Sequence, residues 1–472
     1  MMATVDSLEA LCPFDGRYRE DDRYAPELNR LASHMSERGL IANRLRMEGE
    51  YLIALSEEPG VGLRGFSDVE KSLVRGLYGF PIEDARIVKA IETTGYKNFP
   101  RTRHDVRSLG YFMKDKLEGT SLEDVLPWLH FALTSEDATN IAYGLMLSDT
   151  LSEVILPLGD ELHDQLGSLA DKYKDPPMLA RTHGQPAVPT IFGKEFKNFF
   201  ARLGRQLDQL GDYQVLVKLN GAVGNYNAHH AAYPNVDWLA FTQRFIEKFN
   251  KGREIRLKPN LVTTQIEPHD TYAELFDNLR RMNKVVMQLD KDMWRYISDE
   301  WIKQKADDAP GSSTMPQKIN PEDLERGWGN LEIANAMYDM FSRVLPENML
   351  QRALFDSTIE RTFGFALAAH MLGYRSTIIG LGKSGVNEEK AKAALNEHPE
   401  VIAEGLQTIL RREGRTDAYD QLVELTKGRK GTMDDFRQFI DGLDIPDTVK
   451  EEMRSLTPET YTGLAKRIAE EC

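Results

Sequence analysis

The sequence predicts an all-α protein organised around a central bundle of long helices. In the middle of the chain, apolar residues recur at steps of three and four over many turns, which is the period of an amphipathic helix. Runs of β-branched residues with a period of two are nearly absent, so a Rossmann fold or a barrel has little support. With 472 residues, 41% of them hydrophobic, the chain can bury a sizeable core.

Three parts of the chain differ in pattern, and we predict one domain for each. Residues 1–123 contain short helical segments separated by turns, and residues 124–375 contain the long apolar stripes. Residues 376–472 return to short, charged helical pieces, which Gly-Arg-Lys-Gly at 428–431 interrupts. The expected architecture is therefore a three-domain subunit whose middle domain is the helix bundle.

Three stripes define the expected long helices. The first covers residues 151–173 and contains Pro157, where we expect a kink. The second, at 192–210, is rich in phenylalanine, which favours a packed bundle over an isolated coiled coil. The third, at 275–296, follows Thr-Tyr-Ala-Glu at 271–274, a capping-box pattern for the start of a helix.

Composition excludes several classes of partner and site. The formal net charge is −15, so the chain as a whole repels nucleic acids and anionic membranes, and neither partner is expected. The two cysteines, Cys12 and Cys472, lie at opposite ends, which excludes a disulfide framework and a cysteine zinc site. We therefore expect a reducing compartment and a cytoplasmic location.

No targeting or membrane segment is expected. The first nine residues carry acids where a secretion signal would carry basic residues. The most apolar late stretch, 363–381, is interrupted by His370 and Arg375, which are costly to bury in lipid.

Residues 311–321, Gly-Ser-Ser-Thr-Met-Pro-Gln-Lys-Ile-Asn-Pro, have the strongest chemical character. Their glycine and prolines prevent a continuous helix. Two serines, a lysine and an asparagine place a potential base, a cation and an amide within one loop. The alternative is a plain connection between helices, in which serine and glycine only form turns.

Two further segments allow both a chemical and a structural interpretation. In Arg-Thr-His-Gly-Gln-Pro at 181–186, His183 is followed by residues that end a helix, and its imidazole suits proton transfer. The alternative is a hydrogen-bonded structural histidine. Thr-Ser-Glu-Asp at 134–137 is typical of a helix N-cap, and the same helix start could offer amide donors to a carboxylate.

Together these segments resemble the fumarase/aspartase superfamily and, within it, the adenylosuccinate lyases. The loop at 311–321 is similar to the superfamily signature, and the resemblance runs almost from end to end. The other matching segments are Pro-Phe-Asp-Gly-Arg-Tyr at 13–18, Arg-His-Asp-Val at 103–106, Thr-Ser-Glu-Asp at 134–137, Arg-Thr-His-Gly-Gln-Pro-Ala at 181–187, Lys-Leu-Asn-Gly-Ala-Val-Gly-Asn-Tyr-Asn-Ala-His at 218–229, Thr-Gln-Ile-Glu-Pro-His-Asp at 264–270 and Asp-Ser-Thr at 356–358.

The resemblance implies an all-α, three-domain subunit that assembles into a homotetramer, with each active site built from three subunits. It implies β-elimination of fumarate from adenylosuccinate, giving AMP. It also implies the same reaction on the succinylated aminoimidazole carboxamide ribotide (SAICAR), giving AICAR, in purine nucleotide biosynthesis. No cofactor or metal is implied, and no metal-ligand cluster is visible in the sequence.

The resemblance also assigns catalytic roles by position. Ser312 matches the base that removes the succinyl proton, and His183 matches the acid that protonates the departing nitrogen. Lys318 and Asn320 match the residues that hold the succinyl carboxylate, where negative charge develops. His104 matches a second histidine that positions the substrate. Spacing alone does not distinguish Ser312 from its neighbour Ser313.

The implied substrate contacts are spread along the chain. Arginine predominates among them because its planar guanidinium suits phosphate oxygens. The contacts to the carboxylate and amide groups are Thr134, Ser135 and Gln265. Those of the nucleotide and phosphate pocket are Arg17, Tyr18, Arg352, Ser357 and Arg361. The remaining ones are Arg103, His104, Asp105 and Arg326.

The sequence departs from the family pattern at four places. Gln317 stands where many members have histidine, and Arg103 replaces an asparagine of one branch. Arg326 occupies a position where some members use asparagine, and residues 96–101 resemble an extension ahead of His104. These departures make the substrate contacts near them less secure. They do not remove a group that the reaction uses.

Two other functions are compatible with parts of this pattern. Another lyase of the superfamily, such as argininosuccinate lyase or fumarase, would share the loop at 311–321 but would lack the nucleotide pocket around Arg17, Arg352 and Arg361. A non-catalytic helical scaffold would have no need of His183, Ser312, Lys318 and Asn320.

Overall fold

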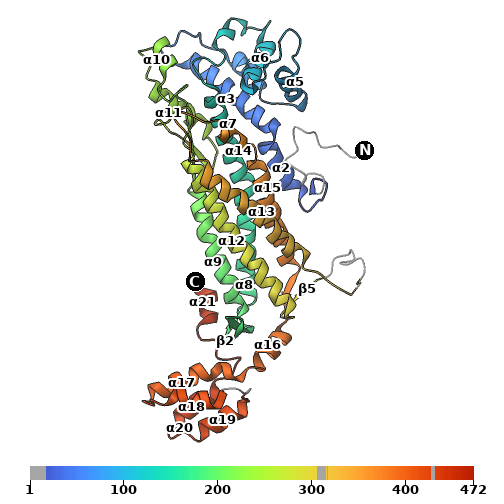
Figure 1. The fold of residues 1–472 in the computed structure, drawn as a ribbon, viewed down its shortest axis with the longest axis vertical. Coiled ribbons are helices and arrows are strands. Elements are labelled where there is room, and N and C mark those ends of the chain that lie inside the picture. The colour runs from blue at the N-terminus through green and yellow to red at the C-terminus, as the bar shows by residue number, and fades with distance from the viewer. Residues whose placement is uncertain (1–17, 306–314, 316, 427–430) are drawn as a thin grey trace. The chain divides into compact units, whose positions relative to one another are not determined.

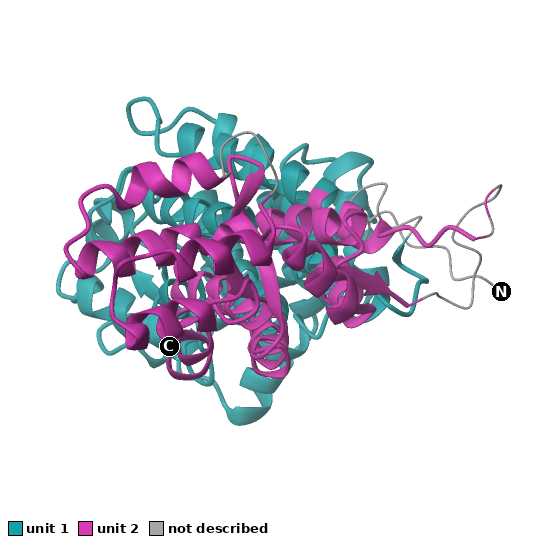
Figure 2. Ribbon diagram, turned by 90° about the horizontal axis from the view of Figure 1, so that it is seen from below, with its two compact units in different colours: residues 1–159, 206–284, 329–375 teal, residues 160–205, 285–328, 376–472 magenta. Residues whose placement is uncertain are grey.

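The structure, a computed structural model, describes residues 18–305, 315, 317–426 and 431–472. The chain forms two compact units (Figure 2). Unit 1 comprises residues 1–159, 206–284 and 329–375, and unit 2 comprises residues 160–205, 285–328 and 376–472. The three-domain division stays a prediction.

Long helices dominate the fold, which confirms the all-α class: 64% of the structure is helical (Figure 1). The phenylalanine-rich stripe lies in α9, and the stripe at 275–296 lies in α12. Helix α12 begins at Asp270, so Thr271 lies inside the first turn and the predicted capping box is wrong. The long helices are α7 (Ser135–Thr150), α8 (Leu156–Lys172), α9 (Phe192–Gly211), α12 (Asp270–Ser298), α13 (Glu322–Val344) and α15 (Phe363–Gly382).

Shortly before Pro157, where we expected a kink, the structure has a π-helical turn, η2 (Leu151–Ile155), between α7 and α8. The N–H of Leu156 donates to the carbonyl of Leu151, five residues back. Proline has no N–H for the carbonyl four residues before it, so a regular helix cannot continue through this point without losing a hydrogen bond.

In unit 1, helices α2 and α3 pack against α7, and a two-stranded parallel sheet of β3 and β4 packs against another part of α7. Gly144 permits this approach, because a Cβ there would lie 2.6 Å from Cγ1 of Val217 in β3. The other elements are α2 (Ala25–Met35), α3 (Glu37–Glu57), α4 (Asp68–Gly76), α5 (Ile82–Thr93), α6 (Asp105–Leu117), η1 (Glu123–Trp128), β3 (Gln214–Val217), α10 (Asn227–Ala232), α11 (Trp238–Phe249), β4 (Arg256–Pro259) and α14 (Phe355–Glu360).

In unit 2, an antiparallel hairpin of β1 and β2 packs against α16, the 3₁₀ helix η3 and α21. A second antiparallel pair joins β5 to β6. The elements are β1 (Pro177–Thr182), β2 (Gln185–Ile191), β5 (Ile302–Gln304), β6 (Ser384–Val386), α16 (Glu388–Asn396), η3 (Pro399–Ile402), α17 (Ala403–Arg412), α18 (Ala418–Thr426), α19 (Met433–Asp441), α20 (Asp447–Ser455) and α21 (Ala465–Glu471).

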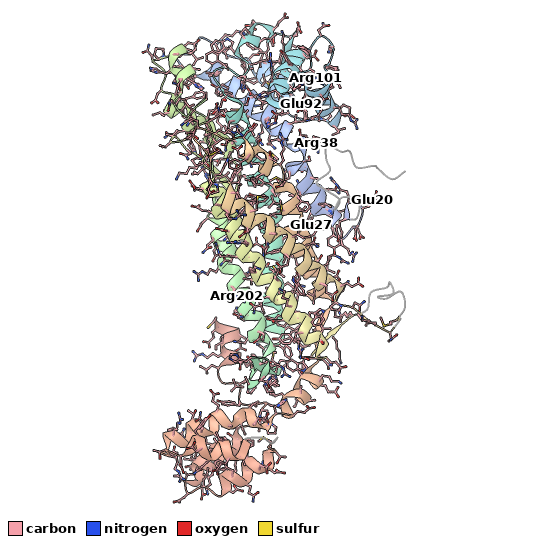
Figure 3. The ribbon with its side chains drawn as sticks, viewed as in Figure 1. Glu20, Glu27, Arg38, Glu92, Arg101 and Arg202 are labelled. Carbon is pink, nitrogen blue, oxygen red and sulfur yellow. The ribbon has the colours of Figure 1, made fainter. Side chains whose placement is uncertain are left out.

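Residues 363–381 lie in α15, and both polar residues that interrupt them are accommodated within unit 1. Arg375 forms an ion pair with Glu27 of α2. Figure 3 labels Glu27. His370 is fully buried and stacks on Tyr374 with ring centroids 4.4 Å apart. In the part of the chain that the structure describes, a single stretch, Ser135–Lys172, is long and apolar enough to cross a membrane, and 78% of its most apolar window is buried inside the fold.

Acid is expected to destabilise the protein through His370. Burial lowers the pKa of His370 to about 3, from an ordinary value of 6.5. Between these values the unfolded chain binds a proton that the folded chain does not, so the free energy of unfolding falls as the pH falls below 6.5. The expected loss at pH 5 is about 2 kcal/mol. Urea unfolding of His370→Leu at pH 7 and pH 5 should show a smaller acid shift than the wild type, whereas the exposed His230→Leu should keep the full shift.

Candidate active site

His183 lies at the tip of the β1–β2 hairpin, so the prediction that its segment ends a helix is wrong. Thr182 pairs with Gln185, which leaves His183 and Gly184 as a two-residue loop. Both have positive φ, 53° and 75°, as a type I′ hairpin turn requires, and glycine at the second position adopts this conformation without strain. The imidazole of His183 is exposed at the end of a strand pair whose base is buried.

The loop at 311–321 lies between β5 and α13 in unit 2, and both Ser312 and Ser313 lie outside the described residues. Lys318 is exposed, and its backbone N–H donates to the carbonyl of Met315 at 3.0 Å. Asn320 is half-buried immediately before α13, and Gln317 is exposed.

Arg326, the fifth residue of α13, is mostly buried and already paired. Its guanidinium donates to Asp323 at 2.8 Å, and the same carboxylate accepts from Lys383 at 2.6 Å. Arg326 thus stabilises the start of α13 through its ion pair with Asp323. A neutral asparagine at this position could not form that ion pair.

Asp137 organises the start of α7 in unit 1. The prediction of an N-cap at Thr134 is confirmed: the N–H of Thr134 donates to the Asp137 carboxylate at 2.9 Å in a capping box. The same carboxylate accepts from the backbone N–H groups of Asn220 and Gly221 at 3.1 and 3.2 Å. It also forms an ion pair with Lys218 at 2.8 Å, in which both side chains are wholly buried. One carboxylate therefore fixes Thr134 and the beginning of the segment at 218–229.

His104 and Asp105 begin α6, beside two arginines. His104 is exposed and is the N-cap residue, whose Nδ1 accepts from a backbone N–H at 3.4 Å. Asp105 forms ion pairs with Arg44 at 2.8 Å and with Arg361 at 3.1 Å, and Arg361 also binds Glu37 at 3.2 Å. Burial opposes ionisation of Asp105, but the charge of Arg44, the hydrogen bond from the backbone N–H of Val106 and then the charge of Arg361 outweigh it and lower its pKa to about 2.

Arg352 lies in a buried ion-pair cluster close to the start of α14. Its guanidinium contacts Glu136 of α7 at 2.7 Å and Asp356 at 3.1 Å. The preceding residue, Gln351, accepts at its carbonyl from the backbone N–H of Gln265 at 3.2 Å. Arg352 and Gln265, both expected to bind substrate, are thus held on neighbouring loops of unit 1.

The remaining expected contacts are also in unit 1, except Arg17, which lies outside the described residues. Tyr18 is buried and packs edge-on against Tyr24 at 5.1 Å. The hydroxyl of Ser357 donates to a backbone carbonyl in the first turn of α14. Arg103 has a φ of 52°, a conformation in which asparagine is far commoner than arginine, which fits the asparagine of the family pattern.

The structure therefore divides the expected residues between the two units. Within unit 1 it brings Arg361 onto Asp105 and groups Thr134 with Asp137. Those of unit 2 are His183, Lys318, Asn320 and Arg326, and those of unit 1 are Tyr18, Arg103, His104, Asp105, Thr134, Ser135, Gln265, Arg352, Ser357 and Arg361.

Several residues that hold this site were not identified from the sequence. Asp137 and Lys218 lie in segments that carry the family resemblance, but spacing cannot show that residues 81 positions apart form a buried pair. Arg44 and Glu37 lie on α3, whose sequence has no motif that marks them. A polar residue within an otherwise apolar helix face, such as Arg44, is the signal that could have indicated them.

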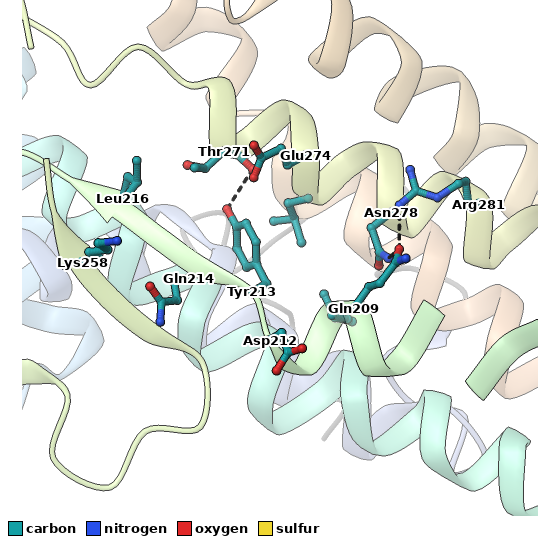
Figure 4. A pocket seen from close by; sticks show the side chains of 12 residues that line it. Gln209, Asp212, Tyr213, Gln214, Leu216, Lys258, Thr271, Glu274, Asn278 and Arg281 are labelled. Carbon is teal, nitrogen blue, oxygen red and sulfur yellow. Dashed lines mark hydrogen bonds between the residues drawn. The ribbon is translucent and has the colours of Figure 1, made fainter. Parts of the chain in front are cut away.

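Two cavities of unit 1 differ in whether an expected substrate contact lines them. A cavity of about 180 Å³ is lined by Glu37, Tyr143, Glu360 and Arg361, and so includes an expected phosphate contact. A larger one, of about 480 Å³, lies between the β3–β4 sheet, the end of α9 and the start of α12 (Figure 4). None of the expected site residues lines the larger cavity. In the part of the chain that the structure describes, no group of three or more potential metal ligands was found.

Family models and individual relatives both identify the family that the sequence resembles. Residues 67–334 match the family model described as Lyase, and residues 348–462 match Adenylosuccinate lyase C-terminal. The chain is 41% identical over 470 residues to an adenylosuccinate lyase of Haemophilus influenzae, with 99% of each chain covered. It is 39% identical over 475 residues to an adenylosuccinate lyase of Escherichia coli, again with 99% of each covered.

Two solved structures share the fold at low sequence identity. A fumarate lyase from Mesorhizobium sp. BNC1 has a TM-score of 0.71 and 17% identity, covering 93% of this chain and 96% of that one. A 3-carboxy-cis,cis-muconate lactonizing enzyme from Pseudomonas putida has a TM-score of 0.73 and 18% identity, covering 96% and 97%.

Proposed function

The chain belongs to the adenylosuccinate lyases of the fumarase/aspartase superfamily, and from that premise we propose how its residues release fumarate. It is a carbon–nitrogen lyase that acts on adenylosuccinate in purine biosynthesis. The observation that carries this function is the match to curated adenylosuccinate lyases over 99% of the chain.

The elimination needs a base and an acid. Ser312 removes the proton from the succinyl carbon beside a carboxylate, and an aci-carboxylate carbanion forms. The carbon–nitrogen bond then breaks, and His183 gives a proton to the departing nitrogen, leaving AMP and fumarate. Because a serine hydroxyl is a weak base in water, closure of the site must stabilise its alkoxide with nearby donors and cations.

Polar and charged residues bind the succinyl end of the anionic substrate. Lys318 and Asn320 hold the succinyl carboxylate at which negative charge develops, while Thr134, Ser135 and Gln265 make further polar contacts. The fixed helix start at Thr134 supports this role, since its amide groups and dipole favour an anion.

We also propose that residues of unit 1 bind the nucleotide part of the substrate. Arg17, Tyr18, Arg352, Ser357 and Arg361 contact the nucleotide and its phosphate. Arg103, His104, Asp105 and Arg326 complete the substrate contacts, with His104 in a positioning role. The cavity beside Arg361 supports this arrangement.

Three finer statements extend the proposal. The chain also releases fumarate from SAICAR to give AICAR, it acts as a homotetramer whose active sites each combine three subunits, and it is cytoplasmic. Exposed Met349, Leu350 and Leu354, at 68%, 95% and 69% exposure, flank Arg352 and would be covered by another copy of the chain. Light scattering of the purified protein tests the tetramer.

The activity is tested by fumarate release, with adenylosuccinate and argininosuccinate assayed side by side. Release from adenylosuccinate alone supports the proposal. Release from argininosuccinate alone would favour the rival lyase, and no release with either substrate from a folded protein would favour a non-catalytic scaffold.

Arg361→Gln is expected to raise the KM for adenylosuccinate by about tenfold or more, with a smaller change in kcat. The guanidinium contributes charge-assisted hydrogen bonds to the bound phosphate in both the ground state and the transition state. Steady-state kinetics check this, with Arg244→Gln as the control. Arg244 is also an exposed arginine with an acidic partner, Glu58, but none of the expected contacts adjoins it, so its KM should be unchanged.

A further inference from the structure

Glu360, the last residue of α14, has a carboxyl group that none of the proposed steps uses. Its side chain is 1% exposed, and neither carboxyl oxygen has a hydrogen-bond partner. It lines the cavity of about 180 Å³ together with Arg361, Glu37 and Tyr143. A buried carboxylate without a donor is strongly disfavoured, because burial removes the water that would stabilise its charge.

The basic groups around Glu360 are already engaged by other acids. Arg352 contacts both Glu136 and Asp356, at 2.7 and 3.1 Å. His269, which is wholly buried, lies 3.9 Å from Asp356. Glu136 and Asp356 thus form the ion pairs with the Arg352 guanidinium and the His269 imidazole. Glu360, the third carboxyl group, forms an ion pair with neither.

Among the described residues that line the cavity, Arg361 is the one cation beside Glu360, and it already pairs with Glu37 and Asp105. Tyr143 of α7 and Tyr272 of α12 are buried phenols, and Glu37 of α3 is an acid that binds Arg361 and Lys89 at 3.2 and 3.1 Å. Burial first, and then the charges of Glu136 and Asp356, raise the pKa of Glu360 to about 8, against the opposing effects of His269 and Arg352.

We propose that Glu360 is a neutral carboxylic acid in the wall of the Arg361 cavity, and that its ionisation at alkaline pH weakens binding of the nucleotide phosphate. The proposal rests on the proposed role of Arg361. A neutral Glu360 leaves the positive potential of Arg361 available to the phosphate, whereas an ionised Glu360 adds a negative charge to the same small cavity. Glu360 is a positioning residue, since it acts through the field at Arg361 and not on the reacting atoms.

Binding of AMP, the product that carries the phosphate, provides the test. The second pKa of a phosphate monoester is about 6, so the charge of AMP is constant above pH 7.5. The protein with ionised Glu360 is expected to bind AMP far more weakly than the protein with neutral Glu360, so the apparent Kd of AMP for the wild-type protein should rise roughly tenfold between pH 7.5 and pH 9. In Glu360→Gln, which cannot ionise, the change should be less than about twofold.

Glu37→Gln is the matched control, because it makes the same change in the same cavity to a carboxylate that has cationic partners. Whatever its Kd at pH 7.5, this variant should retain the alkaline rise. Glu360→Ala serves if the glutamine variant does not fold, and it should also show a flat profile.

Either a flat wild-type profile or a Glu360→Gln profile that rises like the wild type would overturn the role of Glu360. If Arg361→Gln binds AMP as tightly as the wild type at pH 7.5, the cavity does not hold the phosphate, and the proposal is overturned through its premise. Fumarate release from adenylosuccinate would still stand in that case, so the two failures are distinguishable.

Discussion

Ser312→Ala and His183→Ala should each lower the rate of fumarate release from adenylosuccinate by about a thousandfold or more. Each variant removes one of the two groups that we propose as proton carriers, and a positioned acid or base contributes about 10²–10⁴ to the rate. The loss should appear in kcat, because neither group is expected to supply much ground-state binding. Initial rates of fumarate formation at saturating adenylosuccinate measure it directly.

Ser313→Ala distinguishes the two adjacent serines, since it makes the same chemical change one residue away. It should retain most of the activity, and every variant should elute as the same oligomer as the wild type. Near-normal turnover in Ser312→Ala, or a larger loss in Ser313→Ala, would show that the base has been assigned to the wrong residue.

Asp137→Asn is expected to lower the free energy of unfolding by about 3–5 kcal/mol, far more than the loss of an exposed ion pair. The substitution leaves the Lys218 ammonium wholly buried without its counter-ion. It also weakens the hydrogen bonds that hold Thr134, Asn220 and Gly221 on one carboxylate. The cost of an uncompensated buried charge is the dominant effect, because the amide keeps most of the shape of the acid.

Urea unfolding of the variant measures this loss. Asp124→Asn is a suitable control, because Asp124 also pairs with a basic residue, Arg64 at 2.8 Å, but its side chain is 57% exposed, and the unfolding midpoint should hardly move. Combining Asp137→Asn with Lys218→Met should recover part of the stability, since the unpaired ammonium is then gone. No recovery in the double variant would mean that the backbone contacts of Asp137, and not its charge, hold the segment.

The long helices could be predicted from the sequence because their apolar stripes persist over many turns. The stripe at 192–210 coincides with α9 almost residue for residue, and the stripe at 275–296 lies wholly within α12. Pro157 marked the interruption between α7 and α8 because a missing N–H acts locally, whatever surrounds it. The start of α12 was misplaced by the Thr271 motif, which shows that a cap pattern alone does not fix a helix end.

The hairpin that carries His183 could not be predicted in this way. Its second strand contains Pro186 and Pro189, which argue against a strand because each removes a donor. A two-stranded sheet tolerates them, because each strand leaves one edge unpaired. The identities of the site residues came from family resemblance, whereas their ion pairs, such as Arg361 with Asp105, join elements more than 250 positions apart and depend on the fold.

The two-residue turn at His183 and Gly184 makes the position of this imidazole depend on the length of the loop. In a hairpin whose strands alternate between two faces, one extra residue at the tip would shift the pairing of one strand and exchange its inner and outer side chains. Substitutions near the tip can therefore be absorbed, whereas a change of length would need a further irregularity besides the register shift between Leu179 and Arg181. A survey of natural variants should find this turn constant in length even where its sequence varies, so that counting residues between Thr182 and Gln185 identifies chains that can still present the histidine that we propose as the acid.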